Sequence, residues 1–311
     1  MEDSGDPDVI FERHRRRLFG LAYRMLGQAQ DAEDVTQDAY LRWAAAVRSL
    51  IVNPTGWLDR VVTNLCLNRL SSAAARHEYV GPWLPEPVLT GVAGDPADGV
   101  ERRDAVDYAG LVLLERLSPI ERAVFVLRTA FGYGHRELAE LLDLTEEASR
   151  QHYRRARQRI EGERRYDADP AQHRRLLEAF LRAAQQGDLE QLERMLAADA
   201  VARSDGGGVV TAARNPILGR ERVARYLGRG VARIGAGLEL RIVELNGLPG
   251  LVAVVDGRPA AALRLDAADG LVHHVHLVLN PEKLRYLAGH WAGAVTNEPA
   301  VRFSPREQGE S

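Results

Sequence analysis

A segment rich in proline and glycine divides this sequence into parts of different character. Residues 78–104 contain four prolines and four glycines, which interrupt both helices and strands. We therefore expect a linker with extended pieces rather than part of a packed core. Trp83 and Leu84 lie inside it, and a simple spacer has no need of such large apolar side chains. The linker is therefore expected to dock onto another part of the chain.

A helical domain is predicted before the linker, over residues 8–77. Apolar residues recur at helical spacing from Phe11 to Leu26, and a second helix is expected to open at Asp31. Asn53 followed by Pro54 is typical of a helix start. The second helix presents an acidic and polar face made of Asp31, Asp34, Gln37 and Asp38. The residues alone leave open whether this face binds a partner or is only solvated. The third helix offers outward polar side chains at Arg60, Asn64, Asn68, Arg69 and Arg76.

A second helical domain is predicted over residues 105–166, and its centre is a helix-turn-helix pattern at 134–160. Thr145 can cap the second helix of this pattern through its hydroxyl. At about 100° per residue, one side of that helix holds Ser149, Tyr153, Ala156 and Ile160. The opposite side is largely basic, which is typical of a helix that enters a DNA major groove. The side chains expected to contact bases or phosphates there are Arg150, Gln151, Arg154 and Arg155. A solvated charged face is the alternative that these residues leave open.

Helices give way to strands after residue 170. Helices are expected at 171–186, 189–197 and 219–227, with a short strand after residues 205–208. Strands are expected at 238–245, 251–255, 260–265 and 272–279. Helices followed by a meandering antiparallel sheet predict an α+β domain over residues 170–289. A last helical turn is expected at 281–287, and residues 290–311 are expected to form a disordered tail.

Composition limits where the chain acts and what it needs. The 311 residues carry a formal net charge of −3, with a local excess of seven arginines in residues 148–166. One short basic helix makes few phosphate contacts, so the chain is expected to need a partner to reach DNA. The single cysteine, Cys66, excludes an intrachain disulfide. The N-terminus lacks the apolar run of a signal peptide, and no stretch reaches the ~20 apolar residues of a membrane span. A cytoplasmic location is therefore expected.

Several motifs, taken in order, resemble those of bacterial sigma factors. They are residues 31–38 (DAEDVTQD), Pro54-x-x-Trp57-Leu58, Leu117-Ser118-Pro119 and the helix-turn-helix that ends in Arg155-Ala156-Arg157. The match is to the extracytoplasmic-function (ECF) group of the sigma-70 family and covers residues 9–162. The linker sequence at 79–87 (YVGPWLPEP) is similar to that of a subgroup with a fused C-terminal SnoaL-like domain. Asp205-Gly206-Gly207-Gly208 and Asn280-Pro281-Glu282-Lys283-Leu284 are similar to later motifs of the same subgroup.

The resemblance implies a multidomain fold class: two all-α helical domains, a Pro/Gly-rich linker between them, and an α+β SnoaL-like domain of cone shape. It also implies an RNA polymerase sigma factor, which directs promoter-specific transcription initiation and is not an enzyme. The acidic face at Asp31, Asp34, Gln37 and Asp38 would meet the clamp helices of the polymerase's largest subunit, and the polymerase flap is a further expected contact. Promoter DNA would be read at the minus-ten box by Arg60, Asn64, Asn68, Arg69 and Arg76. The minus-thirty-five box would be read by Arg150, Gln151, Arg154 and Arg155.

In the resembled subgroup the fused domain takes the place of a separate anti-sigma factor. The residues expected to couple it to the linker are Trp83, Leu84, Pro85, Glu86 and Pro87; Asp205, Gly206, Gly207 and Gly208; and Asn280, Pro281, Lys283 and Leu284. Two departures from the family pattern stand out. Residues 71–75 (SSAAA) leave mainly Arg69 and Arg76 as basic groups before the linker, and Ser149 and His152 replace residues that are commonly apolar. Weaker backbone contacts at the minus-ten box and looser packing of the recognition helix are the expected consequences.

An alternative function is a DNA-binding protein fused to a SnoaL-like enzyme or small-molecule sensor. Acid–base chemistry would then fall to Asp205, Tyr226, Asp256, His273, His274 or His276. His274 and His276 share one face of a predicted strand, a spacing compatible with two metal ligands. A metal site needs three or four ligands, and no third ligand is evident in the sequence. No metal and no cofactor are therefore expected.

Overall fold

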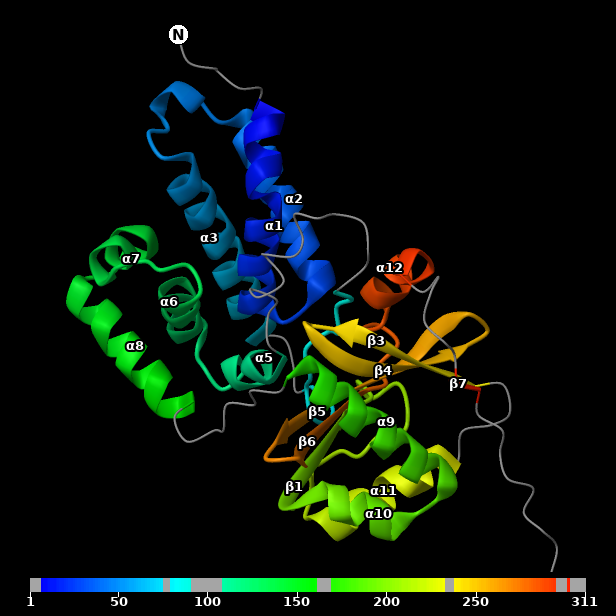
Figure 1. Cartoon of the computed structure of the whole chain (residues 1–311). Helices are drawn as coiled ribbons and strands as arrows, with labels where there is room; N and C mark the ends of the chain where they lie inside the picture. Colours follow the sequence, from blue (N-terminus) through cyan, green and yellow to red (C-terminus); the bar gives the residue numbers. More distant parts are fainter. Residues whose placement is uncertain are drawn as a thin grey trace, which may run out of the picture. The chain divides into compact units, whose positions relative to one another are not determined.

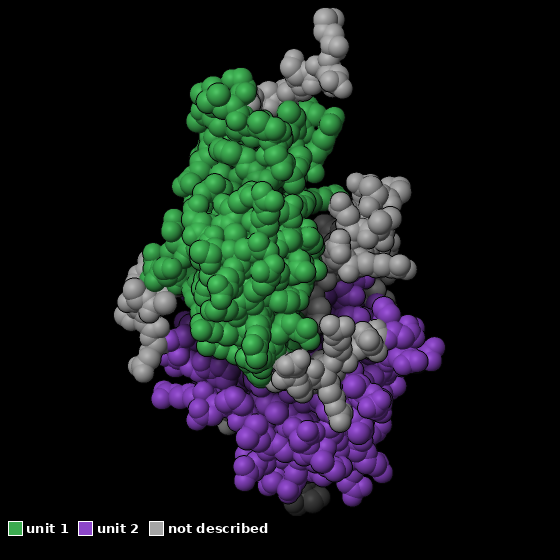
Figure 2. All heavy atoms as spheres, turned by 90° about the vertical axis from the view of Figure 1, so that its left-hand side faces the viewer, with its two compact units in different colours: residues 1–78, 110–163 green, residues 79–109, 164–311 purple. Residues whose placement is uncertain are grey.

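The computed structural model describes residues 7–74, 79–90, 108–160, 169–232, 238–294 and 301–302. The chain divides into two compact units (Figures 1 and 2): unit 1 comprises residues 1–78 and 110–163, and unit 2 comprises residues 79–109 and 164–311. The two predicted helical domains therefore share one unit, and the linker belongs to the C-terminal unit. Arg76, one of the predicted DNA contacts, lies outside the described residues, as do residues 91–107 of the linker region.

Unit 1 begins with helices α1 (Pro7–Leu26), α2 (Ala29–Ala45) and α3 (Pro54–Ala74), with a short 3-10 helix, η1 (Arg48–Leu50), before α3. The predicted apolar stripe of α1 is fully buried, from Phe11 at 2% exposed to Leu26 at 3%. Trp43 of α2 is also buried and lies against Trp57 of α3, with ring centroids 5.7 Å apart. The predicted start of α3 is confirmed, because the Asn53 side chain accepts a hydrogen bond from the Gly56 amide. These contacts hold the first three helices around one core.

The second helical part contains α5 (Tyr108–Leu114), α6 (Pro119–Thr129), α7 (His135–Leu142) and α8 (Glu146–Ile160). The first two residues of α5 belong to unit 2. Ser118 and Glu121 form a capping box at the start of α6, and the Thr145 hydroxyl accepts from the Ala148 amide at the start of α8. Asp143, between α7 and α8, adopts a left-handed conformation with φ 54°. The helix-turn-helix predicted from the sequence is therefore present.

Unit 2 is an α+β domain built on one mixed sheet. Helices α9 (Pro170–Gln186), α10 (Leu189–Met195) and α11 (Arg220–Ala232) accompany strands β1 (Leu196–Asp205), β2 (Ile217–Leu218), β3 (Glu239–Leu245), β4 (Leu248–Val255), β5 (Arg258–Ala268), β6 (Leu271–Val278) and β7 (Val301–Arg302). The strand order is β2-β1-β6-β5-β4-β3-β7. Strands β3 to β6 form the predicted antiparallel meander, whereas β1 pairs with β6 in parallel. The prediction of a wholly antiparallel sheet is corrected by this one pair.

Three two-residue turns fix the register of the meander. Asn246–Gly247, Asp256–Gly257 and Asp269–Gly270 each connect consecutive strands, and all six residues have positive φ. Two left-handed residues in succession make the turn whose twist matches that of paired strands, and Asn-Gly or Asp-Gly are the residues that tolerate it. The three hairpins are therefore encoded locally.

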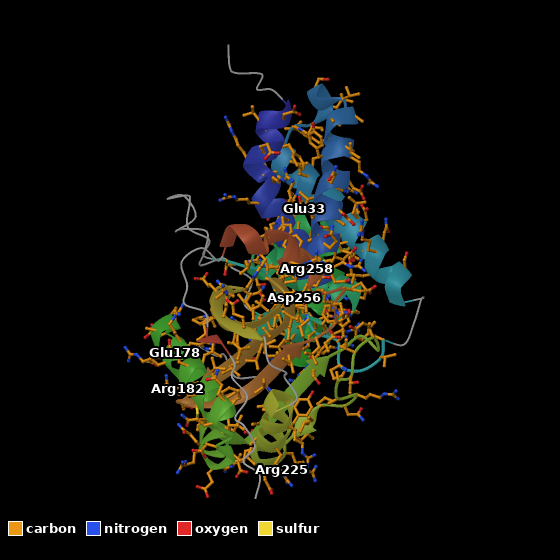
Figure 3. All side chains as sticks on the ribbon, turned by 90° about the vertical axis from the view of Figure 1, so that its right-hand side faces the viewer. Glu33, Glu178, Arg182, Arg225, Asp256 and Arg258 are labelled. Atoms are coloured by element: carbon orange, nitrogen blue, oxygen red, sulfur yellow. The ribbon has the colours of Figure 1, made fainter. Side chains whose placement is uncertain are left out.

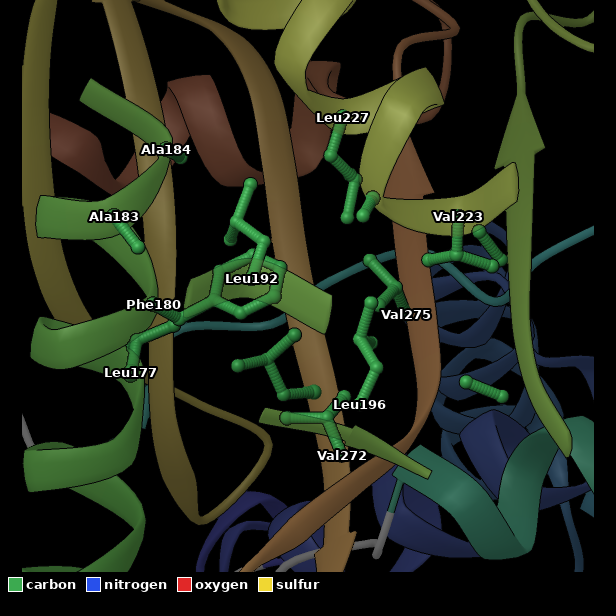
Figure 4. Close-up of a cluster of buried hydrophobic side chains, with 14 residues drawn as sticks. Leu177, Phe180, Ala183, Ala184, Leu192, Leu196, Val223, Leu227, Val272 and Val275 are labelled. Carbon is green, nitrogen blue, oxygen red and sulfur yellow. The ribbon is translucent and has the colours of Figure 1, made fainter. Parts of the chain in front are cut away.

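The core of unit 2 lies between helices α9 to α11 and one face of the sheet (Figure 4). Phe180 of α9, Val223 of α11 and Val275 of β6 meet there, each at most 4% exposed. Leu196, Ala200 and Ala202 contribute from β1, a strand that the sequence analysis missed. The prediction had extended a helix to Ala197 and placed a strand after residue 208, but the strand precedes the glycines and ends at Asp205. Alanine and charged residues have low strand propensity, and burial against the helices overrides it here.

The C-terminal part of unit 2 is more regular than expected. Helix α12 (Arg285–Ala294) continues beyond the predicted end, and β7 pairs with β3. The disordered tail predicted from residue 290 is therefore corrected at residues 290–294 and 301–302, and its remaining residues lie outside the described ones. None of the described helices has the length and apolar character that crossing a membrane requires.

Candidate functional site

The outer face of α8 presents the predicted DNA-contacting side chains to solvent. Arg150, Gln151, Arg154 and Arg155 are all exposed, whereas Ser149 and Ala156 on the opposite side are fully buried. Arg150 pairs with Glu146 one turn earlier on the same helix. The buried Ser149 hydroxyl lies 3.0 Å from His135 Nδ1 of α7, so a polar pair connects the two helices where an apolar contact was expected. The departure at Ser149 is thus accommodated rather than left unsatisfied.

The acidic face of α2 is exposed along one side of the helix. Asp34 and Gln37 are exposed, and Asp31 and Asp38 are partly so. The face is not empty, because Arg69 of α3 donates to Asp31 Oδ1 at 2.6 Å. The Arg69 guanidinium also lies 3.7 Å from Asp34 and 3.9 Å from Asp38. The structure therefore brings together one predicted DNA contact and three predicted polymerase contacts.

The remaining predicted minus-ten residues lie on α3. Asn68 is exposed and Asn64 is half-buried. Arg60 Nη2 donates to both carboxylate oxygens of Asp143 in the helix-turn-helix, at 2.8 and 2.9 Å. Both side chains remain largely exposed, at 47% and 75%, so this pair contributes at most about 1 kcal/mol. Arg60 is nevertheless held by a contact with the turn between α7 and α8.

A buried carboxylate joins the two helical parts of unit 1. Asp59 of α3 is fully buried and ion-pairs with Arg17 of α1. Tyr133, in the loop between α6 and α7, donates its hydroxyl to Asp59 Oδ2 at 2.5 Å. Burial and the Asp59 carboxylate raise the Tyr133 pKa to about 12. Sequence reasoning missed this contact, although Asp59 follows Leu58 and shares the buried side of α3 with Val62 and Cys66.

Two further contacts close the same interface. Buried Arg122 of α6 donates to the Met25 carbonyl oxygen at 2.8 Å and pairs with Glu115 at 2.7 Å. The Arg17 guanidinium lies 4.8 Å from the centroid of the Phe131 ring, within the range of a cation–π contact. Unit 1 is thus held in a closed arrangement by buried polar groups and not only by exposed ion pairs.

In unit 2 the linker docks onto Asp205 at the end of β1. The Leu84 amide donates to Asp205 Oδ2 at 2.8 Å, and the Tyr79 hydroxyl donates to Oδ1 at 2.5 Å. The Gly207 amide also donates to Oδ1, at 3.1 Å. Burial of the Tyr79 phenol and its bond to Asp205 raise the Tyr79 pKa. A fully buried carboxylate therefore holds both the linker and the turn that follows β1.

Lys283 completes this site from the other end of the domain. Its ammonium lies 2.7 Å from Asp205 Oδ2 and donates to the Leu84 carbonyl oxygen at 2.5 Å. The same ammonium lies 3.8 Å from the Trp83 ring centroid and 4.9 Å from that of Tyr79. Lys283 is the only lysine of the sequence, and its side chain is 5% exposed. Two aromatic rings and a carboxylate of unit 2 thus surround one buried cation.

The rest of the linker follows the surface of unit 2. Leu84, Pro85, Glu86 and Pro87 are buried. The Tyr108 hydroxyl donates to the Pro85 carbonyl oxygen at 2.9 Å. Further on, the Asn246 amide donates to the Val88 carbonyl oxygen at 2.9 Å, beside the β3–β4 turn. The linker is therefore bound along its described length and is not a free spacer.

The glycines after Asp205 permit this close approach. Gly207 has φ +59°, and a Cβ atom built on it would lie 2.2 Å from the Asn280 side-chain nitrogen. A Cβ on Gly208 would lie 3.2 Å from Val80 of the linker. The Asn280 amide donates to the Asp205 carbonyl oxygen at 2.9 Å. In the segment that follows Asn280, Leu284 is buried and Pro281 is exposed.

The acid–base candidates of unit 2 are dispersed. Asp256 lies in the exposed β4–β5 turn next to Arg258 (Figure 3), and the Tyr226 hydroxyl donates to Ser204 at 2.8 Å. His276 Nε2 lies 2.7 Å from Asp266, and both groups are buried. Burial opposes ionisation of Asp266, but the adjacent His276 still lowers its pKa. His274 lies beside His276, with ring centroids 5.8 Å apart, and His273 lies 3.8 Å from Asp199. Within the described ranges, no three His, Cys, Asp or Glu side chains are grouped so as to hold a metal ion.

Both helical parts of unit 1, and the chain as a whole, are similar to known proteins. Residues 10–76 match the model of sigma-70 region 2, and residues 111–160 match that of sigma-70 region 4. The ECF RNA polymerase sigma factor SigJ of Mycobacterium tuberculosis is 38% identical over 291 residues, covering 88% of this chain and 91% of SigJ. The probable ECF RNA polymerase sigma factor SigI of the same species is 33% identical and covers 93% of this chain and 98% of SigI. The crystal structure of SigJ superimposes with a TM-score of 0.71 at 34% identity, covering 93% of this chain and 99% of that one. The similarity thus extends over both units.

Proposed function

We propose a division of labour among the surfaces of this chain, starting from the fact that it belongs to the ECF family of RNA polymerase sigma factors. Its helical unit carries the sigma-70 regions that serve transcription initiation, and its C-terminal unit has the SnoaL-like α+β fold. The proposal assigns DNA reading and polymerase docking to unit 1. It assigns modulation of that activity to unit 2, in place of a separate anti-sigma factor.

The outer face of α8 is assigned to the minus-thirty-five box. Arg154 and Arg155 are exposed there, and guanidinium groups bind guanine edges or phosphates through two bonds. The surface of α3 and the loop before it are assigned to the minus-ten box. Leu50 and Val52 in that loop are 78% and 99% exposed, which is costly for apolar side chains unless they meet a partner such as an unstacked base. Both assignments are supported by the exposure of these side chains.

The acidic face of α2 is assigned to the clamp helices of the polymerase's largest subunit. Asp31, Asp34 and Asp38 supply carboxylates on one side of the helix, and complementary charge steers docking of a basic partner. The modest net charge of −3 supports the same division. Most of the affinity for promoter DNA would come from polymerase rather than from the sigma factor alone. Both would act in the cytoplasm.

The closed arrangement of unit 1 is assigned to a resting state. The centres of the minus-ten and minus-thirty-five boxes lie about 25 base pairs apart, which is about 85 Å at ~3.4 Å per base pair. A compact unit of this length has a diameter of roughly 36 Å. A unit held together through Asp59, Tyr133 and Arg122 therefore cannot contact both boxes, and it must open for initiation.

The single observation that carries the regulatory assignment is the contact of the linker with Asp205 and Lys283. The linker connects the two DNA-reading parts in sequence, so a docked linker restricts how far they separate. Release of the linker would lengthen the connection and allow both boxes to be reached. Unit 2 would then set promoter activation without touching DNA.

Run-off transcription with purified core polymerase tests this function. The full chain is expected to co-elute with core polymerase and to direct transcription from its promoter. Trp83→Ala and Gly207→Asp are expected to alter the transcript yield while the helix content of unit 1 is unchanged. Leu218→Ala, an exposed apolar side chain of unit 2, is the matched control. A chain that never associates with core polymerase contradicts the proposal, and so do unchanged yields in both linker-site variants.

A further inference from the structure

Arg69 lies across the acidic face of α2. It donates to Asp31 at 2.6 Å, and its guanidinium lies within 4 Å of Asp34 and Asp38. Its side chain is 33% exposed, so the contact lies at a water-accessible surface and is not a core ion pair. One cation of α3 therefore neutralises part of the surface to which a basic partner would bind.

We propose that Arg69 is an internal competitor for the polymerase-docking face, and that docking releases it toward the minus-ten strand. This inference rests on the proposed function of the α2 face. An incoming lysine or arginine of the partner needs the same carboxylate oxygens that Arg69 occupies, and two cations cannot share them without repulsion. Docking must therefore displace the guanidinium.

The position of Arg69 on α3 would allow the released guanidinium to contact DNA. Arg69 lies on the helix assigned to the minus-ten box, and its side chain is long and flexible, so a displaced guanidinium would reach a phosphate or base edge bound there. DNA bound there would in turn hold Arg69 away from Asp31. The two binding events therefore strengthen each other, since coupling between sites is reciprocal. A free sigma factor contacts neither partner at full strength.

The size of the effect follows from the exposure of the pair. Partly exposed ion pairs change an equilibrium constant by about fivefold, equivalent to about 1 kcal/mol. Arg69→Ala is therefore expected to tighten binding to core polymerase about fivefold. The same variant is expected to form fewer open complexes, because the released arginine is missing at the minus-ten strand.

The experiment measures the Kd of the full chain for immobilised core polymerase. Arg42→Ala is the matched control, because Arg42 is an exposed arginine of α2 and its removal changes the net charge by the same amount. Arg69→Gln removes the charge but keeps the aliphatic stem through Cδ, and so guards against loss of packing between α2 and α3. The inference predicts that both Arg69 variants bind core more tightly than Arg42→Ala does. Open complexes are counted separately by permanganate footprinting of the minus-ten region.

Each outcome separates this inference from the function on which it rests. If Asp34→Asn and Asp38→Asn leave the Kd for core unchanged, the α2 face is not the docking surface and the proposed function is wrong there. If those variants weaken binding but Arg69→Ala binds no more tightly than Arg42→Ala, the competition is refuted. If Arg69→Ala binds more tightly and still forms open complexes at the normal level, the release toward DNA is refuted.

Discussion

Replacing Trp83 by alanine tests how firmly the linker is docked. The indole ring lies 3.8 Å from the Lys283 ammonium, and a desolvated cation–π contact of this kind contributes about 2 kcal/mol. Losing it raises the population of the undocked linker by about 30-fold, since ~1.4 kcal/mol is a factor of ten. The lost apolar packing of the ring adds to this value, so about 30-fold is the lower bound.

The assay uses the fact that Lys283 is the sole lysine. Its amine is buried while the linker is docked, so acetylation by an amine-reactive ester reports the undocked population when redocking is faster than labelling. Peptide mass spectrometry then gives the labelling rate of Lys283 against that of the α-amino group in the same sample. We expect Trp83→Ala to raise this ratio by at least about 30-fold and the control Leu218→Ala to leave it unchanged.

Two results would refute the reasoning. A parent chain whose Lys283 reacts as fast as a lysine in a short peptide has no docked linker in solution. A Trp83→Ala chain with an unchanged ratio has a linker held by something other than the aromatic contact. A urea titration of each variant shows whether faster labelling reflects unfolding of unit 2 instead of linker release.

Three further predictions concern single residues. Gly207→Ala is expected to destabilise unit 2 by about 1–3 kcal/mol in urea titrations, because Gly207 has a positive φ and an added Cβ would clash with Asn280. Gly257→Ala is the control: Gly257 also has a positive φ, but no atom lies near its Cβ position, so this variant should lower the unfolding free energy less. Tyr133→Phe is expected to destabilise unit 1 by about 1–3 kcal/mol, because buried Asp59 loses a donor. Tyr40→Phe is the control, because the Tyr40 hydroxyl donates to the exposed Asp8; equal urea midpoints for the two variants would contradict this. Burial, and to a smaller extent the nearby Arg264, lower the His173 pKa from 6.5 to about 4. Between pH 6.5 and pH 4, therefore, His173 binds a proton in the unfolded chain but not in the folded chain. The unfolding free energy should therefore fall by about 3 kcal/mol as pH drops from 6.5 to 4, and His173→Gln should flatten that dependence.

Local signals in the sequence predicted most of the elements. Asn53 with Pro54, Ser118 with Pro119, and Thr145 each mark a helix start through a capping side chain, and such signals act within one turn of chain. The Asn-Gly and Asp-Gly turns act over a similarly short range. The α+β class of unit 2 was predicted from helices followed by strand-like runs that Gly, Asp or Pro separate, and the structure confirms it.

Strand β1 and the long-range polar contacts of unit 1 are not encoded by such short-range signals. Leu196–Asp205 is a strand only because its partner β6 is paired beside it and helices cover its alanines. Asp59 contacts Tyr133 across 74 positions, and Arg69 contacts Asp31 across 38, so neither pair leaves a local pattern. The side chains predicted to bind DNA and polymerase are mostly exposed, as binding requires, but their roles stay predictions. That Arg60 and Arg69 contact acidic groups far away in the sequence was not evident from composition or spacing.

The parallel pairing of β1 with β6 has a consequence for protein synthesis. Asp205 reaches its final position only when Leu271–Val278 has left the ribosome, and Lys283 follows later still. Helix α8 ends at Ile160, so the helices of unit 1 emerge more than a hundred residues earlier. At about 5–20 residues per second this interval lasts roughly 6–25 seconds. During that time a nascent chain has complete α7 and α8 helices but lacks the buried Asp205–Lys283 pair that holds the linker. A chain released early would keep its linker undocked permanently.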